Sequence, residues 1–151
     1  MLVAAFLATV IGISDGDTLT VLNENKQQIK IRLAEIDAPE KKQDFGTRSK
    51  QSLSDLCFGK QAEIIPKVKD RYKRTVARVK CAGVDANAEQ VNRGMAWVYR
   101  QYAKDHNLYI LQHEAQRLKS GLWADQSPTP PWEWRKIKRK IAVQSERSFY
   151  V

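Results

Sequence analysis

The chain has 151 residues, with 26 lysines and arginines against 17 aspartates and glutamates, giving a formal net charge of +9. This length suits one domain with one core. The positive charge favours a polyanionic partner such as nucleic acid, although an anionic membrane surface or simple solubility would also account for it. No run of 18 apolar residues occurs, which excludes a membrane-spanning helix.

The first half of the chain reads as β-structure. Residues 1–7 are a possible remnant of a signal peptide or an N-terminal extension. Residues 4–13 are rich in β-forming side chains, a turn signal follows at 14–17, and 18–22 resumes in an extended pattern. These features predict a hairpin.

Residues 28–35 alternate between apolar and polar side chains, which predicts a third strand with Arg32 facing away from its apolar side. A helix is expected over about 46–57. Two further strands are expected at 61–66 and 75–81, on either side of the basic loop 67–74.

Two helices are predicted next. Asp85 or Asn87 can cap a short helix that ends at Gly94, and a longer helix is expected over 107–120, stopped by Gly121. One stripe of the longer helix would carry Leu108, Leu111, Ala115 and Leu118. Five strands with helices around them predict an α+β fold, a small closed five-stranded β-barrel with three helices.

Residues 8–124 would form this domain and 125–151 a C-terminal extension. The proline-rich segment at 127–131 predicts a stiff extended stretch, and residues 132–151 carry six basic and two acidic residues. Trp123 and the segment 128–134 would form either a clamp packed over the barrel or an exposed binding strip. The basic tail would add nonspecific affinity for nucleic acid or be disordered.

Two acidic groups stand where the first hairpin turns and where the third strand ends. The segment 14–18 resembles the start of a calcium loop, but the rest of an EF-hand is missing. In a closed barrel the two places can lie side by side, so Asp17 and Asp37 could share a hard cation while Glu40 sits one water away. Without a nearby histidine or cysteine, calcium or magnesium is favoured over zinc.

Three blocks of sequence carry a resemblance to a known family: Asp-Gly-Asp-Thr at 15–18, Arg-Leu-Ala-Glu-Ile-Asp-Ala-Pro-Glu at 32–40, and Asp-Arg-Tyr-Lys-Arg at 70–74. In this order and spacing they resemble the signature blocks of the staphylococcal nuclease (thermonuclease) family. The similarity runs over residues 8–123 and includes 87–94. It implies an OB-fold barrel, a single calcium ion, and hydrolysis of DNA and RNA to products with 3′-phosphate ends.

The resemblance also implies roles for individual residues. The calcium ligands would be Asp17, Asp37 and the main-chain oxygen of Ala38. The catalytic residues would be Glu40, which orients and deprotonates the attacking water, and the phosphate-binding arginines Arg32 and Arg74.

Substrate contacts are expected in two places. Tyr72 matches a tyrosine of the family's nucleotide pocket, and Arg71 beside it adds positive charge for the phosphates. Tyr102 lies where relatives carry further pocket tyrosines. The two histidines, His106 and His113, receive no role.

Cys57 and Cys81 fit neither a zinc site nor a redox pair, so they are either buried thiols or one disulfide. In the barrel the two positions come close if the fourth and fifth strands pair antiparallel, which makes a disulfide reasonable. A disulfide and millimolar calcium both suit a secreted or periplasmic protein. We expect a monomer that acts on DNA and RNA and does not enter the membrane.

Two rival hypotheses remain open. One is a catalytically silent nuclease-like module that only binds nucleic acid or a protein, and it gives no reason to keep all five acidic and arginine site residues. The other is a general OB-type single-strand binder, which predicts binding that survives chelation and no acidic cluster.

Overall fold

A computed structural model describes residues 4–149 of the chain. Five strands form its centre: β1 (Phe6–Asp15), β2 (Thr18–Leu22), β3 (Gln28–Leu33), β5 (Gln61–Lys69) and β6 (Thr75–Cys81). Neighbouring strands pair antiparallel in the order β3-β2-β1-β5-β6, and a parallel pairing of β3 with β6 closes the barrel. The predicted α+β fold with a closed five-stranded barrel is confirmed.

Short strands extend this framework. β7 (Val84–Asp85) adds to β6, and β4 (Ile36–Asp37) pairs antiparallel with β8 (Trp97–Val98), placing Asp37 opposite Trp97. The fourth barrel strand, β5, continues three residues past Pro66, the predicted end, because a register shift between Pro66 and Val68 accommodates the proline.

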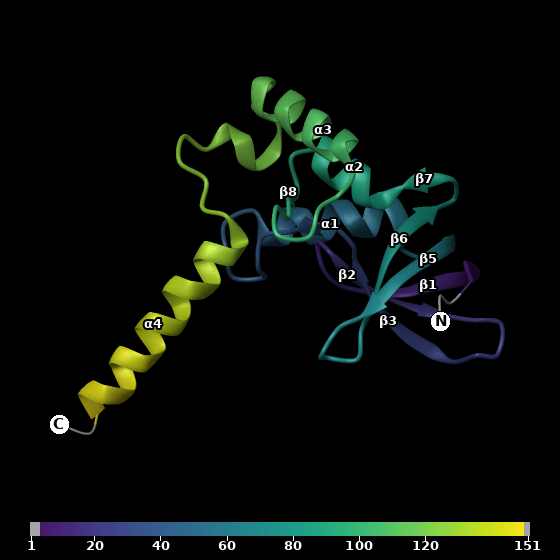
Figure 1. The fold of residues 1–151 in the computed structure, drawn as a ribbon, viewed down its shortest axis with the longest axis horizontal. Coiled ribbons are helices and arrows are strands. Elements are labelled where there is room, and N and C mark those ends of the chain that lie inside the picture. Colours follow the sequence, from purple (N-terminus) through teal and green to yellow (C-terminus); the bar gives the residue numbers. More distant parts are fainter. Residues whose placement is uncertain (1–3, 150–151) are drawn as a thin grey trace.

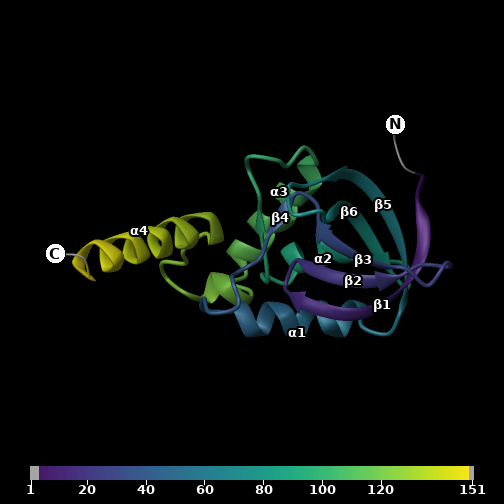
Figure 2. The same ribbon diagram turned by 90° about the horizontal axis from the view of Figure 1, so that it is seen from below.

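Three helices accompany the barrel. They are α1 (Gly46–Cys57), α2 (Ala86–Asn92) and α3 (His106–Arg117). They lie on one side of the molecule, and α1 runs along β1 and β2 in the second view (Figures 1 and 2). Between them and the strands lies one core whose largest fully buried members include Leu19, Ile31, Leu33, Ile36, Leu53, Ile64 and Leu108.

The apolar stripe predicted for α3 is wrong for its last residue, Leu118, which does not pack into the core. Leu108 and Ala115 are buried, but Leu118 is 59% exposed. The helix ends at Arg117, and Lys119 then takes a positive φ of 53°, so the chain turns before Leu118 can continue the stripe.

The C-terminal extension differs from expectation. After a short 3-10 turn, η1 (Gly121–Ala124), the chain forms a long helix, α4 (Pro131–Phe149), which projects away from the barrel (Figures 1 and 2). Pro131 stands at the first helical position, where its fixed φ is favourable, while Glu133 and Arg147 complement the helix dipole at the two ends. Of the two alternatives for the basic tail, disorder is therefore wrong for the described residues, and added affinity for nucleic acid stays a prediction.

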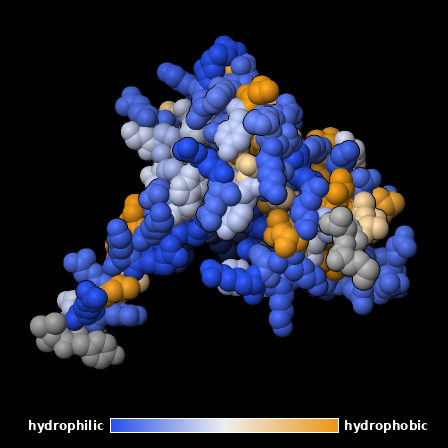
Figure 3. Space-filling model, viewed as in Figure 1, coloured by the Kyte–Doolittle hydropathy of each residue, from blue (hydrophilic) through white to orange (hydrophobic). Residues whose placement is uncertain are grey.

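Hydrophilic side chains cover most of α4 in Figure 3, with a few apolar positions among them. Ile137, Ile141 and Val143 are its exposed large apolar side chains. No helix within residues 4–149 combines the length and apolar character needed to cross a bilayer.

A disulfide joins Cys57, at the end of α1, to Cys81, at the end of β6. Both cysteines are fully buried. The bond therefore fastens the first helix to the fifth barrel strand across a sequence separation of 24 residues.

Removing this disulfide in a Cys57→Ala, Cys81→Ala double variant is expected to lower the free energy of unfolding by about 3–4 kcal/mol, because a closed loop of this size restricts the unfolded chain. Urea unfolding measures the loss. The parent protein treated with a reductant is the control and should approach the variant. A loss under about 1 kcal/mol would contradict the expectation.

Candidate active site

Asp17 lies at the base of the β1–β2 turn, which is fastened to the end of β3. Its Oδ2 accepts a hydrogen bond from the backbone N–H of Ala38 at 2.8 Å, and its Oδ1 accepts one from the Thr18 hydroxyl at 3.1 Å. Its main-chain oxygen accepts a bond from the N–H of Leu33. Gly16 allows the turn to pack closely against Ala38 and Ser49. A Cβ at this position would lie 1.8 Å from the Ser49 hydroxyl oxygen and 2.9 Å from the Ala38 Cβ. The turn carboxylate is thus held against the β4 segment.

Asp37 ends β4 and is 1% exposed, and Ala38 next to it is also buried. Glu40 follows Pro39 in a loop, and its side chain keeps 32% of its surface exposed. The backbone N–H of Glu40 donates a hydrogen bond to the side-chain oxygen of Gln43 at 3.1 Å. Asp37 is therefore enclosed, whereas Glu40 is held in a loop that water can reach.

Arg32 joins the two aspartates. Its Nη2 lies 3.4 Å from Asp17 Oδ2 and 3.4 Å from Asp37 Oδ1. Its Nη1 donates to the carbonyl oxygens of Leu33 at 2.6 Å and Ile36 at 2.9 Å, which fixes the guanidinium. One positive nitrogen thus faces both carboxylates from a rigid position.

Burial and neighbouring charges shift the pKa values of the aspartates in this cluster. Burial raises the pKa of Asp15 to about 7, and the charge of Asp17 adds to the effect. Burial raises the pKa of Asp37 as well. Burial alone would do the same to Asp17, but the charge of Arg32 and several hydrogen bonds hold its pKa below the usual value.

The donor set fits a hard cation. Asp17 and Asp37 both direct a carboxylate oxygen toward one positively charged nitrogen, and oxygen ligands are those that calcium and magnesium prefer. Within residues 4–149 no three or more His, Cys, Asp or Glu side chains gather in a metal-binding group. A cation here would depend on these two carboxylates and on main-chain oxygen such as that of Ala38.

Arg74 lies apart from this ion-pair cluster. Its Nε donates to Asp70 Oδ2 at 2.7 Å, and its guanidinium lies 5.5 Å from the ring centre of Tyr72. Arg71 approaches the same ring at 5.0 Å, and the tyrosine is 64% exposed. The loop between β5 and β6 thus groups three of the predicted residues, Arg71, Tyr72 and Arg74, with one another.

Tyr102 belongs to an aromatic cluster near β8. It packs edge-on against Tyr99 with ring centres 4.9 Å apart and is 59% exposed. On the other side, Tyr99 stacks on Trp132 at 5.5 Å with nearly parallel rings. Trp97 contacts both Trp123 and Trp132. Trp123 and Trp132 are therefore packed against the domain, as in the first of the two alternatives, and do not form an exposed binding strip.

The structure adds one residue that the sequence did not indicate. Arg135, in the second turn of α4, donates from Nη2 to Asp37 Oδ2 at 2.7 Å and from Nη1 to Glu40 Oε1 at 2.6 Å. Its other contacts are Asp37 Oδ1 at 3.2 Å and the Tyr99 hydroxyl oxygen at 3.5 Å. In the sequence it is one of six basic residues in the tail, and nothing distinguishes it from the others.

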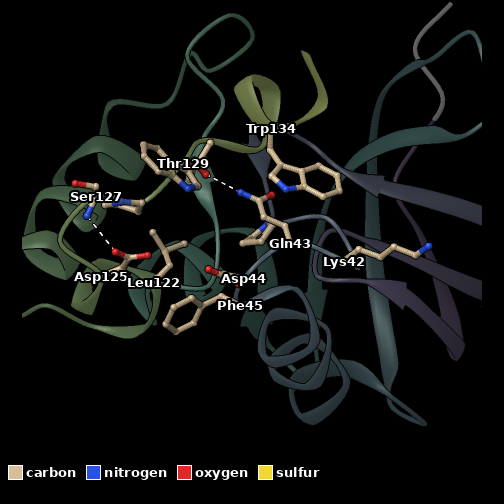
Figure 4. Close-up of a pocket in the computed structure, with 12 residues that line it drawn as sticks. Lys42, Gln43, Asp44, Phe45, Leu122, Asp125, Ser127, Thr129 and Trp134 are labelled. Atoms are coloured by element: carbon tan, nitrogen blue, oxygen red, sulfur yellow. Dashed lines mark hydrogen bonds between the residues drawn. The ribbon is translucent and has the colours of Figure 1, made fainter. Parts of the chain in front are cut away.

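A pocket lies beside this cluster, between the 39–45 segment and the chain that leads into α4 (Figure 4). Gln43 reaches across it and donates a hydrogen bond to the carbonyl oxygen of Thr129 at 2.7 Å. Trp134 also lines it, whereas Asp17, Asp37 and Glu40 do not. The pocket therefore marks where the C-terminal segment docks rather than where the carboxylates gather.

The closed five-stranded barrel, with its arginine-bridged carboxylates beside the first hairpin, defines a staphylococcal nuclease-like domain. The chain belongs to the staphylococcal nuclease homologue family, whose sequence model matches residues 30–125. This range includes Arg32, Asp37, Glu40 and Arg74 but neither Asp17 nor α4.

Several relatives share most of the chain. It is 50% identical over 130 residues to a protein named uncharacterized endonuclease from Haemophilus influenzae, covering 86% of this chain and 73% of that one. It is 42% identical over 147 residues to a micrococcal nuclease of Shigella flexneri, covering 90% of this chain and 84% of the relative. It is also 36% identical over 113 residues to a staphylococcal-like nuclease of Arabidopsis thaliana, covering 75% and 35% of the two chains.

Proposed function

We propose that this protein is a calcium-dependent nuclease that hydrolyses phosphodiester bonds in DNA and RNA and leaves 3′-phosphate ends. One observation carries the proposal: two buried aspartates face the same positively charged nitrogen, with Glu40 beside them in an accessible loop. The nuclease names of the relatives and the net charge of +9 support it.

Asp17, Asp37 and the main-chain oxygen of Ala38 would hold the calcium ion. When bound, the ion supplies positive charge that stabilises the phosphate oxygens in the transition state. Arg32 adds a fixed positive charge at the same place. Its backbone contacts keep it there without reorganisation during the reaction.

Glu40 would orient the attacking water and take its proton. Its side chain is partly exposed, so water can approach it, and its loop follows directly from Asp37. A carboxylate in this position is suited to general-base catalysis. The displaced 5′ oxygen needs positive charge or a proton, which we assign to Arg74.

The assignment of Arg74 requires a change of partner. Its side chain pairs with Asp70 at a surface where 27% of the Arg74 side chain is exposed, and such pairs contribute little to stability. A substrate phosphate can therefore compete for this guanidinium. Arg71 and Tyr72 would bind the sugar-phosphate chain and a base, and Tyr102 a further nucleotide.

A single-stranded DNA oligonucleotide incubated with calcium is expected to be cleaved, and an excess of chelator should stop cleavage. Arg74→Ala should lower kcat by about 100-fold or more, because it removes a charge that acts in the transition state. Arg93→Ala, which breaks a more exposed pair of the same i, i+4 spacing with Glu89, is the control and should keep near-normal activity.

Intact DNA under all conditions would reject the enzyme and favour a silent nuclease-like module. Binding of DNA that survives chelation without cleavage would favour a single-strand-binding role. End-group analysis of the products tests the 3′-phosphate, and parallel RNA assays test the second substrate.

We also propose that the protein is a monomer that works outside the reducing cytoplasm, secreted or periplasmic. The buried disulfide supports this location, because such bonds persist in oxidising compartments. Cell fractionation combined with a free-thiol count tests it. Two reactive thiols in protein isolated from the cytoplasmic fraction would contradict it, and sedimentation tests the monomer.

A further inference from the structure

The start of α4 is docked onto the loop that carries Glu40. Gln43 makes two hydrogen bonds there: its side-chain oxygen accepts from the backbone N–H of Glu40 at 3.1 Å, and its Nε2 donates to the Thr129 carbonyl oxygen at 2.7 Å. Figure 4 shows the Gln43 side chain between Thr129, in the loop before α4, and Trp134. One side chain thus ties the Glu40 loop to the entrance of the helix.

Aromatic packing fixes the same helix end from a second direction. Trp132 stacks on Tyr99 at 5.5 Å and meets Trp97 edge-on at 5.6 Å. Trp97 is the strand partner of Asp37 in the β4–β8 pair. The first turn of α4 therefore has a defined place relative to both Asp37 and Glu40, although the rest of the helix projects away from the barrel (Figure 1).

From the second turn of α4, Arg135 spans the two carboxylates. It forms a two-pronged pair with Asp37, at 2.7 and 3.2 Å, and a bond of 2.6 Å to Glu40. The closest contact with Asp37 is through Oδ2, whereas Oδ1 lies 3.4 Å from Arg32 Nη2. Since each carboxylate oxygen has two lone pairs, Oδ1 can accept from Arg135 and also from Arg32.

We propose that Arg135 is a positioning residue of the nuclease site, which fixes Glu40 relative to Asp37 and makes α4 a working part of that site. This inference rests on the proposed function. A guanidinium suits the task because it stays charged and its planar fork can hold two carboxylates at set positions. Asp37 also gains a permanent counter-charge in a place that is 1% exposed.

An inhibitory plug is the competing explanation of the same contacts. It would require α4 to leave before catalysis. The docking described above opposes this, because Gln43, Trp97 and Tyr99 all hold the helix end through groups distinct from Arg135. The geometry favours a helix that stays in place while the substrate enters.

The test compares Arg135→Ala with Arg139→Ala in the intact chain. Arg139 is exposed on the same helix, so its replacement removes an equal charge from α4 without removing a contact to Asp37 or Glu40. Steady-state cleavage of a single-stranded DNA oligonucleotide at saturating calcium gives kcat and KM. For Arg135→Ala we expect kcat to fall at least about tenfold with KM within about threefold, and for Arg139→Ala both within about twofold.

Arg135→Lys separates charge from geometry. A lysine keeps the positive charge but is a point donor, so it should recover only part of the lost kcat. Circular dichroism and the thermal midpoint check the fold of each variant. Because Arg135 lies outside the barrel core, the midpoint should change by only a few degrees, and the lysine variant remains as the test if the alanine variant unfolds.

Calcium titration by calorimetry gives a readout without turnover. Removing a positive charge that touches Asp37 should leave the calcium affinity of Arg135→Ala unchanged or higher, while kcat falls. Loss of calcium binding in a folded variant would overturn the proposal by making Arg135 part of the metal site's framework.

Two other results would overturn the inference. Higher activity in Arg135→Ala than in the parent would identify an inhibitory contact, and activity equal to that of Arg139→Ala would show that the bridge has no catalytic effect. An inactive parent protein would instead reject the proposed nuclease function itself, so the two failures are distinguishable.

Discussion

Replacing Glu40 with glutamine is expected to lower kcat for DNA cleavage by about two to four orders of magnitude, the range typical for loss of a general base. Glutamine has nearly the same shape and can still accept the hydrogen bond that Arg135 donates at 2.6 Å. It cannot take a proton from water. The change therefore removes the proposed chemistry and leaves the contacts of the loop largely intact.

Single-turnover cleavage of an oligonucleotide, with protein in excess over DNA, measures the chemical step directly. Glu24→Gln is the matched control, because Glu24 is an exposed carboxylate in the turn after β2, and its replacement should leave the rate within about twofold. Calcium affinity and the thermal midpoint should be nearly unchanged in Glu40→Gln. A rate within tenfold of the parent would remove Glu40 from the role of base.

The barrel and its helices were largely predictable because local signals agree with the tertiary structure. The helix predicted over 46–57 matches α1, and the turn signal at 14–17 covers the end of β1 and the two turn residues before β2. In these segments the hydrophobic pattern and turn residues point to the same structure that the core requires.

The failures have physical causes outside local sequence. Leu118 fits the apolar stripe of α3 by spacing, but the chain turns at Lys119 before that face reaches the core. The helical tail was not foreseen because its proline-rich entrance reads as extended, although proline is also favourable at a first helical position.

In the candidate site too, some contacts could be predicted from the sequence and others depend on tertiary packing. The approach of Asp17 to Asp37 follows from the hairpin and the end of β3, which sequence blocks mark clearly. Arg135 is 98 residues from Asp37, and no periodicity links them. Only the packing of α4 against Trp97 and Tyr99 brings that arginine to the carboxylates. The Arg74 side chain pairs with Asp70 and lies over the Tyr72 ring rather than at the carboxylates, so the roles assigned to Arg74 and Tyr72 stay predictions.

Replacing Asn87 with alanine is expected to lower the free energy of unfolding by about 3–5 kcal/mol, since each buried polar group left without a partner costs about 1–3 kcal/mol. Asn87 is fully buried, and Asp85 rather than Asn87 caps α2. Its side-chain oxygen accepts from the N–H of Val79 at 3.0 Å, and its Nδ2 donates to the carbonyl oxygens of Ala34 at 2.9 Å and Ala77 at 3.2 Å.

These three bonds join α2 to β6 and to the turn between β3 and β4, so the loss should also reach the site through Asp37, three residues beyond Ala34. Urea unfolding measures the stability, with Asn25→Ala in an exposed turn as the control, for which we expect less than about 0.5 kcal/mol. Asn87→Asp should be at least as damaging as alanine, because it keeps the acceptor but turns a buried charge toward two carbonyl oxygens. If Asn87→Asp were as stable as the parent, the side-chain amide would not be holding these segments together.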